Sequence, residues 1–156
     1  MKEHTIFRVS LVIYLFFSFL MPSQKNEILA VMDDYNKAFA EADYSRIVKL
    51  FDYPASFNLE DKTIMASNRF KLKLIYKKIR GDLPDYYSYS KWKEMKVQLI
   101  DSNIAIVNAD FVRYKNDGTI YYSGSAQYHL RLENDCWKIF SLTPYEKIMF
   151  LDLNSK

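Results

Sequence analysis

The spacing of apolar residues divides the chain into a mainly helical first half and a strand-forming second half. In three segments of the first half, apolar side chains recur at every third or fourth position, which is typical of helices with one buried face. From Tyr87 onward they alternate with polar side chains, which indicates strands. We expect helices over 26–42, 44–51 and 68–80, and strands over 55–59, 63–66, 90–100, 104–115, 120–133 and 136–142. Helices followed by an antiparallel meander predict an α+β fold.

Residues typical of helix ends bound the second and third helices. Asp43 and Ser67 are suited to be their N-caps, because a short polar side chain can accept a hydrogen bond from the first helical turn. Pro54 is expected to stop the second helix. Gly81 stands where a helix commonly ends with a glycine in the left-handed conformation.

Two short turns fix the expected pairing of the last strands. Asp117-Gly118 predicts a two-residue type I′ turn, and Asn134-Asp135 predicts a second tight turn because both residues tolerate a positive φ. With these turns, the opposed pairs are Tyr114 with Tyr121, Val112 with Ser123, Asp110 with Ser125, Asn108 with Gln127, Ile106 with His129, Leu132 with Trp137 and Leu130 with Ile139.

This register gives the sheet one apolar face and one mixed face. The apolar face holds Ala105, Val107, Ala109, Phe111, Ala126, Tyr128, Leu130, Leu132, Trp137 and Ile139. The mixed face concentrates polar groups on adjoining strands, as a pocket with a few convergent polar groups would. Its candidate ligand-binding residues are Asn108, Asp110, Ser125, Gln127 and His129. The alternative is that this face is the outer, half-solvated or dimer-forming side of the sheet.

Asp110 and His129 do not form an acid–base pair in this register. They lie four positions apart along the sheet, about 13 Å of strand, which is beyond hydrogen-bond reach. The only other histidine is His4, so a site built on paired histidines is not expected in the chain after residue 23. We expect no metal and no cofactor.

The first 23 residues have the pattern of a targeting segment. Lys2 and Arg8 precede an apolar run from Val9 to Met21, which is too short for a comfortable membrane span and suits a signal peptide. We therefore expect residues 1–23 to be a signal peptide or an N-terminal membrane anchor, and residues 24–156 to form a single domain. The protein would be exported (periplasmic, secreted or envelope-anchored), with membrane contact only through residues 1–23 if they are not cleaved. The alternative is a buried N-terminal helix of a cytosolic protein.

Composition narrows the classes of partner and site. The net charge of +3 is too small to indicate nucleic-acid binding. Cys136 is the single cysteine, which excludes an intrachain disulfide, and a lone cysteine in a strand is expected to be a small buried hydrophobe. The third helix carries six basic residues. These fit either a docking face for an acidic partner or anionic headgroups, or an ordinary solvated face.

Two stretches resemble nuclear transport factor 2-like (SnoaL-like) domains. YNKAFAEADYSRIVKLFDYPASF resembles the opening of that superfamily, and IAIVNADFVRYKNDGT with YHLRLENDCWKIFS resembles its terminal hairpins. Ala42 and Asp135 stand where those motifs commonly have glycine. The resemblance covers about residues 26 to 143, and its motifs are structural ones.

The resemblance implies a cone-shaped, strongly bent antiparallel sheet packed on three N-terminal helices, with a pocket at the wide end and often a homodimer formed through the sheet. The superfamily includes isomerases, dehydratases, cyclases, carriers and association domains, so the fold leaves the function open. One hypothesis is an exported module that binds a small apolar or amphipathic ligand, or another protein. The other is an isomerase- or lyase-type enzyme that uses Asp110 or His129 for proton transfer in a Tyr-lined pocket.

Overall fold

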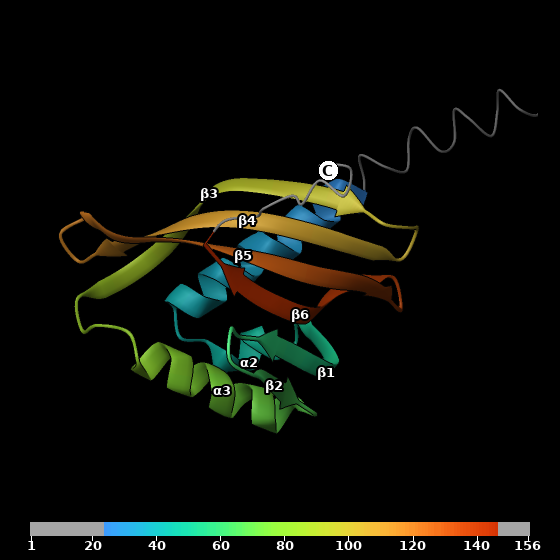
Figure 1. Cartoon of the computed structure of the whole chain (residues 1–156), viewed down its shortest axis with the longest axis horizontal. Coiled ribbons are helices and arrows are strands. Elements are labelled where there is room, and N and C mark those ends of the chain that lie inside the picture. The colour runs from blue at the N-terminus through green and yellow to red at the C-terminus, as the bar shows by residue number, and fades with distance from the viewer. Residues whose placement is uncertain (1–23, 147–156) are drawn as a thin grey trace, which may run out of the picture.

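The computed structural model describes residues 24–146, and the expected targeting segment, residues 1–23, lies outside this range. The first helix covers residues 24–40. It is followed by α2 (Tyr44–Ile47), β1 (Phe51–Asn58), β2 (Thr63–Ala66), α3 (Arg69–Gly81), β3 (Tyr87–Leu99), β4 (Ile104–Lys115), β5 (Ile120–Glu133) and β6 (Cys136–Tyr145), as Figure 1 shows. Among these helices, none is long and apolar enough to cross a membrane.

All six strands form one open sheet in the order β2-β1-β6-β5-β4-β3. The pairs are antiparallel except for β1 and β6, which run parallel. In Figure 1 the first helix crosses behind β3, β4 and β5, and α3 lies at the lower edge of the molecule. This arrangement confirms the expected α+β architecture, with one parallel pair added to the antiparallel meander.

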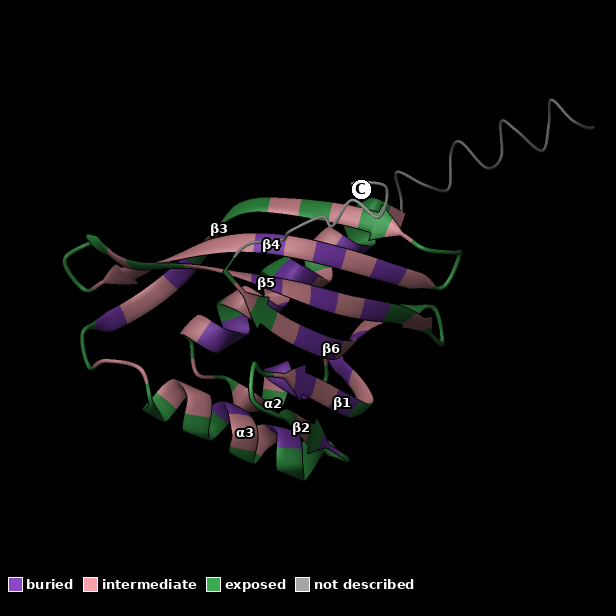
Figure 2. Cartoon of the chain, viewed as in Figure 1, coloured by how far each residue is buried: buried purple, intermediate pink, exposed green. Residues whose placement is uncertain are grey.

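The core lies between the first helix and the apolar face of the sheet. Ile28, Met32, Tyr35 and Phe39 form the buried stripe of the helix. On the sheet, eight residues of the expected apolar face are buried: Ala105, Val107, Ala109, Ala126, Tyr128, Leu130, Trp137 and Ile139. Phe111 and Leu132 of that face are only partly buried, and Leu142 is buried as well, because a register shift in β6 places it opposite Tyr128. Figure 2 shows buried and less buried residues alternating along β4 and β5. Alternation along a strand therefore identified the core side of the sheet.

The register of β4, β5 and β6 is confirmed over most of its length. Asp110 pairs with Ser125 and Leu132 pairs with Trp137. The Asn134-Asp135 turn has φ of 48° and 59° at its two residues, as a type I′ turn requires.

The turn at Asp117-Gly118 differs from the expected type I′ geometry. Of its residues, Gly118 alone has a positive φ, 81°, and its N–H donates to the Lys115 carbonyl at 3.0 Å. A longer loop of this kind places an extra residue in β5, so Tyr114 pairs with Ile120 and not with Tyr121.

Three expected helix boundaries were wrong. The second helix ends at Ile47, because the segment from Phe51 joins the sheet beside β6, and Pro54 lies inside β1. The N-cap of α3 is Asn68, whose side chain accepts from Lys71 N at 3.0 Å. Gly81 is the last residue of α3 and has no positive φ, since the helix ends at Asp82 in a right-handed conformation.

Candidate functional site

The five candidate residues from the sequence lie together on the sheet face turned away from the first helix. Four of them are joined in two cross-strand pairs between β4 and β5. Ser125 Oγ donates to Asp110 Oδ1 at 2.6 Å, and Gln127 Nε2 donates to Asn108 Oδ1 at 2.9 Å. All are half-buried. Their polar atoms are therefore used largely in bonding one another, which fits a surface better than an empty pocket.

His129 stands apart from Asp110 on this outer face. It lies opposite Ile106 and Ser141, and its ring stacks on Phe140 with 5.9 Å between centroids. Burial lowers the pKa of His129, which favours its neutral form. Because Asp110 bonds to Ser125 and not to His129, the structure forms no acid–base dyad from these two residues.

The polar pairs continue from β5 to the far edge of the sheet. Gln127 lies opposite Thr143, and Asn58 Nδ2 donates to Thr143 Oγ1 at 3.1 Å and to Ser141 Oγ at 2.9 Å. Ser56 Oγ also donates to Ser141 Oγ at 2.9 Å. The outer face thus carries a polar band across β4, β5, β6 and β1, and we call this band the outer polar face.

The opposite, concave side of the sheet holds polar chemistry that the sequence reasoning missed. Arg113 follows Phe111 on the core-facing side of β4, and its guanidinium carbon lies 5.3 Å from the Phe111 ring centre and 4.8 Å from that of Tyr122. Its Nε is buried and has no hydrogen-bond partner. No carboxylate in the described part of the chain forms an ion pair with it. The alternation that assigned Phe111 to the apolar face also assigns Arg113 to it.

Further side chains at this end of the sheet have unused polar atoms. The Arg80 guanidinium lies over the Tyr87 ring at 4.4 Å, and Tyr86 packs edge-on against Tyr121 at 5.0 Å. Arg80 Nε and Trp92 Nε1 are buried without a hydrogen-bond partner in the described structure. Burial raises the pKa of Tyr121, and the positive charge of Arg113 and its hydrogen bond with the Tyr121 side chain oppose that shift. We call Arg80, Trp92, Phe111, Arg113, Tyr121 and Tyr122 the concave aromatic site.

Three fully buried tyrosines extend the concave aromatic site into the core. The Tyr76 hydroxyl donates to the Tyr35 hydroxyl at 3.2 Å, and the Tyr35 and Tyr128 rings pack edge-to-face at 5.6 Å. Burial raises the pKa of Tyr35, Tyr76 and Tyr128, so all three hydroxyls stay protonated. Arg113 lies close enough to oppose that shift at Tyr35 and Tyr128.

The buried groups of the described residues include no carboxylate and no imidazole, since Ser90 and Ser141 are the buried polar side chains. The same residues contain no cluster of three or more metal-ligating side chains. The concave aromatic site therefore holds guanidinium, indole and phenol groups whose polar atoms are covered by neighbouring side chains, so a ligand would have to move those side chains to reach them. These groups stabilise anionic or carbonyl oxygens, and neutral phenols and guanidinium groups are poor proton acceptors.

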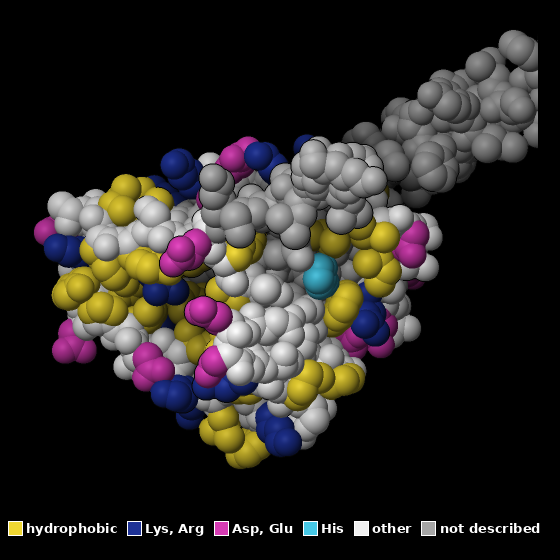
Figure 3. Space-filling model, in the orientation of Figure 1, with side chains coloured by type: hydrophobic (Ala, Val, Ile, Leu, Met, Phe, Trp, Pro, Cys, Tyr) yellow, Lys and Arg dark blue, Asp and Glu magenta, His cyan; other side chains and the backbone are white. Residues whose placement is uncertain are grey.

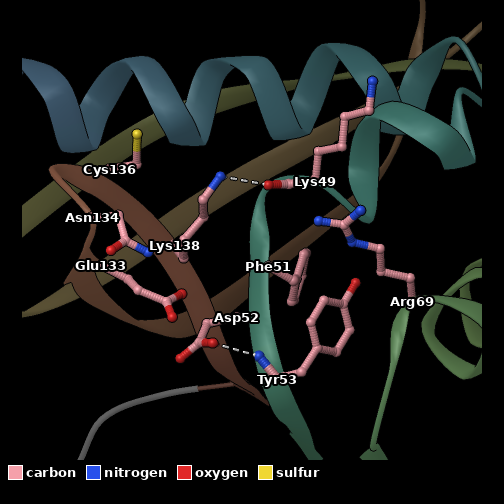
Figure 4. Close-up of a pocket in the computed structure, with 9 residues that line it drawn as sticks. All are labelled: Lys49, Phe51, Asp52, Tyr53, Arg69, Glu133, Asn134, Cys136 and Lys138. Carbon is pink, nitrogen blue, oxygen red and sulfur yellow. Dashed lines mark hydrogen bonds between the residues drawn. The ribbon is translucent and has the colours of Figure 1, made fainter.

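An open pocket of about 380 Å³ lies where β1 passes the β5–β6 turn. Figure 4 shows its lining: Lys49, Phe51, Asp52, Tyr53, Arg69, Glu133, Asn134, Cys136 and Lys138. Cys136 is exposed, which corrects the expectation of a buried residue, because it directly follows the exposed Asn134-Asp135 turn and pairs with the exposed Glu133.

The less exposed charges of this open pocket already have partners. Asp52 accepts from Tyr53 N at 2.7 Å and pairs with Arg131 at 3.3 Å. Lys138 Nζ donates to the Lys49 carbonyl at 2.6 Å. Burial raises the pKa of Tyr53 to about 12. The open pocket thus has fewer unpaired buried groups than the concave aromatic site.

Comparisons with known proteins agree with this architecture. The family model described as "NTF2-like protein (DUF6841)" matches residues 26–147. Among curated proteins, no relative matches the chain.

Solved structures share the fold at low sequence identity. A variant of Rv3472, a protein of unknown function from Mycobacterium tuberculosis, superposes with a TM-score of 0.69 at 14% identity, over 88% of this chain and 82% of that one. An NTF2-like protein with a cystatin-like fold from Novosphingobium aromaticivorans gives 0.68 at 11% identity, over 91% and 90%. A proposed dehydratase of the NTF2-like family from Streptomyces avermitilis gives 0.63 at 14%, over 82% and 99%.

These similarities show a shared fold. Any inference about ligand or reaction rests on the side chains described above. The family model covers most of the chain, including the first helix and all six strands. The chain belongs to the NTF2-like family, in the group designated DUF6841.

Proposed function

We propose that this domain binds a small, largely apolar ligand that carries one anionic group, in the concave aromatic site. The observation that carries the proposal is Arg113, whose buried Nε has no hydrogen-bond partner and whose charge has no carboxylate beside it in the described chain. The rings of Phe111 and Tyr122 beside it supply apolar contact area.

Free-energy considerations favour an occupant for this site. A buried donor that is left unpaired costs about 1–3 kcal/mol, which a ligand oxygen can offset by accepting its hydrogen bond. Guanidinium groups suit carboxylate, sulfonate and phosphate oxygens because they offer several donors in one plane. Trp92 Nε1 provides another donor without a partner at the same end of the sheet.

Binding fits the site better than proton transfer does. An isomerase or lyase needs a carboxylate or imidazole at the reacting atom. Asp110 and His129, the residues expected for that role, lie on the outer polar face, and the buried polar residues of the described chain are serines. At the concave aromatic site, the enzyme hypothesis would therefore require a base that none of its described residues supplies.

A pair of dyes tests this proposal on residues 24–156. 8-Anilinonaphthalene-1-sulfonate carries a sulfonate, and N-phenyl-1-naphthylamine has the same rings without it. For Arg113→Gln, we expect sulfonate-dye affinity to fall roughly tenfold to a hundredfold, because a hydrogen bond to a charged group contributes about 1.5–3 kcal/mol. Affinity for the uncharged dye should stay nearly constant.

Lys93→Gln is the matched control, since Lys93 lies on the same sheet and is exposed. It should leave the affinity for both dyes unchanged. Equal affinity of the native protein and Arg113→Gln for the sulfonate dye would contradict the proposal. Native mass spectrometry of the protein purified from its host would identify a natural ligand as mass that is lost on denaturation.

The outer polar face supports a second proposal, self-association. Its polar side chains hydrogen-bond to one another across the strands, so they could be covered without losing their partners. The face also spans four strands, which is an extended surface of the kind that a homodimer interface uses. Gln127→Glu would add a negative charge close to Asp110, which lies two residues beyond Asn108, the hydrogen-bond partner of Gln127. In a symmetric dimer through this face, the new carboxylate would also repel its copy in the other subunit. Sedimentation velocity should show a dimer for residues 24–156 and a larger monomer fraction for the variant. A native monomer would contradict this second proposal.

Export through residues 1–23 completes the proposed setting of this domain. The proposal is supported by the basic start and the apolar run of that segment. Fractionation of the host followed by N-terminal sequencing tests it. Protein found in the cytosol with an intact Met1 would contradict export.

A further inference from the structure

The outward face of α3 combines exposed apolar residues with basic ones. Leu72 and Tyr76 are buried and hold the helix on the core. On its other side Phe70 is 70% exposed and Leu74 is 50% exposed, although both are large apolar side chains. Met65, on the neighbouring strand β2, is also 50% exposed. A contiguous patch of exposed apolar side chains indicates a surface that binds another protein or a membrane.

Lysines flank this apolar pair on both sides. At roughly 3.6 residues per turn, Phe70 and Leu74 project opposite the buried Leu72 and Tyr76. The same geometry places Lys73 and Lys77 along one side of the pair and Lys71 and Lys78 along the other. The basic residues are thus not confined to one flank, because an apolar stripe runs between two rows of lysine. At the lower edge of Figure 3, hydrophobic and basic side chains gather at the place where α3 lies in Figure 1.

The charge of α3 is of one sign. Between Arg69 and Gly81 there are six basic residues and no acidic one. Four of them, the lysines named above, flank Phe70 and Leu74, whereas Arg69 lines the open pocket and Arg80 belongs to the concave aromatic site. The ion pair at the end of the helix, between Lys78 Nζ and Asp82 Oδ2 at 2.9 Å, is well exposed and therefore weak. The surface around Phe70 and Leu74 is consequently strongly positive and complements an anionic partner.

We propose that the outward face of α3 docks on an anionic lipid bilayer. Phe70 and Leu74 enter the boundary between headgroups and acyl chains, and the two rows of lysine reach anionic headgroups on either side of them. The charge of the helix argues for an acidic surface. The apolar residues stand out on a protruding helix at the edge of the molecule, which suits a flat, deformable bilayer better than a protein cleft.

A fluorescent label on the full chain tests this contact independently of any anchor at residues 1–23. Bimane is attached at Leu74→Cys in a Cys136→Ser background, and a control label is placed at Asn116→Cys in the β4–β5 turn. With vesicles of phosphatidylcholine and phosphatidylglycerol, the label at 74 should shift to the blue. Lipid nitroxides should quench it, and it should be protected from acrylamide. Pure phosphatidylcholine vesicles, high salt and the label at 116 should show none of these effects.

Matched lysine variants measure the charge contribution. Replacing Lys71, Lys77 and Lys78 by Gln should lower the equilibrium constant for docking of α3 on the vesicle by roughly fivefold per lysine. The control replaces Lys91, Lys93 and Lys96 on β3, which are also exposed, and should change it little. Circular dichroism checks that each variant is folded.

Three results would overturn the proposal. The label at 74 could remain equally accessible to acrylamide on anionic and neutral vesicles. The β3 lysine variant could weaken docking as much as the α3 variant, which would mean that net charge and not this helix face is recognised. Finally, poly-glutamate could protect the label while anionic vesicles do not, which would assign the face to an acidic protein. None of the labelled or substituted residues belongs to the concave aromatic site, so this experiment and the dye experiment test the two proposals independently.

Discussion

Gly124 and Tyr122 lie on the same side of β5, and the absence of a side chain at residue 124 makes room for the Tyr122 ring. A Cβ atom on residue 124 would lie 2.7 Å from Tyr122 Cε1 and 2.8 Å from Phe111 Cζ. Both rings contact the Arg113 guanidinium. The glycine therefore allows the two rings of the concave aromatic site to take their places beside Arg113.

We expect Gly124→Ala to displace these rings and to change the free energy of unfolding by no more than about 1 kcal/mol, because Tyr122 is 46% exposed and its ring can move outward. Affinity for the sulfonate dye should fall as well, because the displaced rings form the apolar wall beside Arg113. Urea unfolding and dye titration measure the two effects.

Gly81→Ala is the control for this substitution. Nothing lies within 4 Å of a Cβ at residue 81, in the last turn of α3. Alanine there should stabilise the protein by up to about 1 kcal/mol and leave dye binding unchanged. If Gly124→Ala behaved like Gly81→Ala in both measurements, the proposed role of Gly124 would be wrong.

Ala42 and Asp135 are strained because each adopts the left-handed backbone conformation without being glycine. Their φ angles are 54° and 59°. These are the two positions at which the resembling motifs commonly have glycine, and the structure supplies the physical reason. The left-handed conformation destabilises a residue that has a Cβ by about 1–2 kcal/mol. Glycine avoids this strain, but part of the resulting stabilisation is offset by the greater conformational freedom of glycine in the unfolded chain.

We therefore expect Ala42→Gly and Asp135→Gly each to raise the free energy of unfolding by about 0.5–1 kcal/mol, measured by urea denaturation. Ala38→Gly is the opposite control, because Ala38 lies within the first helix and is fully buried. It should destabilise the protein by about 1 kcal/mol. A loss of stability in both Ala42→Gly and Asp135→Gly would show that contacts of the native side chains outweigh the backbone strain.

Local sequence signals predicted the β4–β5–β6 meander, because short turns join strands that are neighbours in the chain. The Asn134-Asp135 turn alone fixes Leu132 opposite Trp137. The parallel pairing of β1 with β6 joins Phe51 to Ile139, and no turn residue can encode such a distant partner. The sequence consequently indicated a strand near Ala55 without showing that it starts at Phe51.

The concave aromatic site was missed for a different reason. Periodicity assigns a residue to a face of the sheet, and it does not show whether a polar residue on the buried face finds a partner there. Arg113 follows the alternation of β4, yet its lack of a carboxylate partner depends on what the first helix and β3 bring near it. The mixed face attracted attention because it is richer in polar residues. In the structure those residues pair with one another.

The side chain of Asn68, and not that of its neighbour Ser67, should stabilise the N-terminus of α3. Its Oδ1 accepts from Lys71 N at 3.0 Å, and its φ of −161° with ψ of 173° is the extended conformation of an N-cap residue. Asn68→Ala should lower the free energy of unfolding by about 1 kcal/mol. Ser67→Ala should change it by less than about 0.5 kcal/mol, because Ser67 Oγ receives only a long contact from Asn68 Nδ2 at 3.5 Å. Chemical denaturation of both variants checks this, and a larger loss for Ser67→Ala would reverse the assignment of the cap.

His129 should make the stability of the domain depend on pH in the mildly acidic range. Burial lowers its pKa in the folded protein below the ordinary value of 6.5, so the unfolded chain takes up the proton more readily. Where the unfolded state binds more protons, the free energy of unfolding rises with pH. The contribution of His129 is therefore complete above about pH 6.5 and is lost as the pH falls below that value.

His129→Gln removes this titration and keeps a polar side chain beside Phe140. In residues 24–156 no other histidine contributes, because His4 lies in the segment that has been removed. Urea unfolding at a series of pH values between about 5 and 7.5 should show a positive slope for the native sequence and a flatter profile for the variant. Parallel profiles would mean that His129 has the same pKa in the folded and unfolded states, and that its place on the outer polar face leaves it fully hydrated.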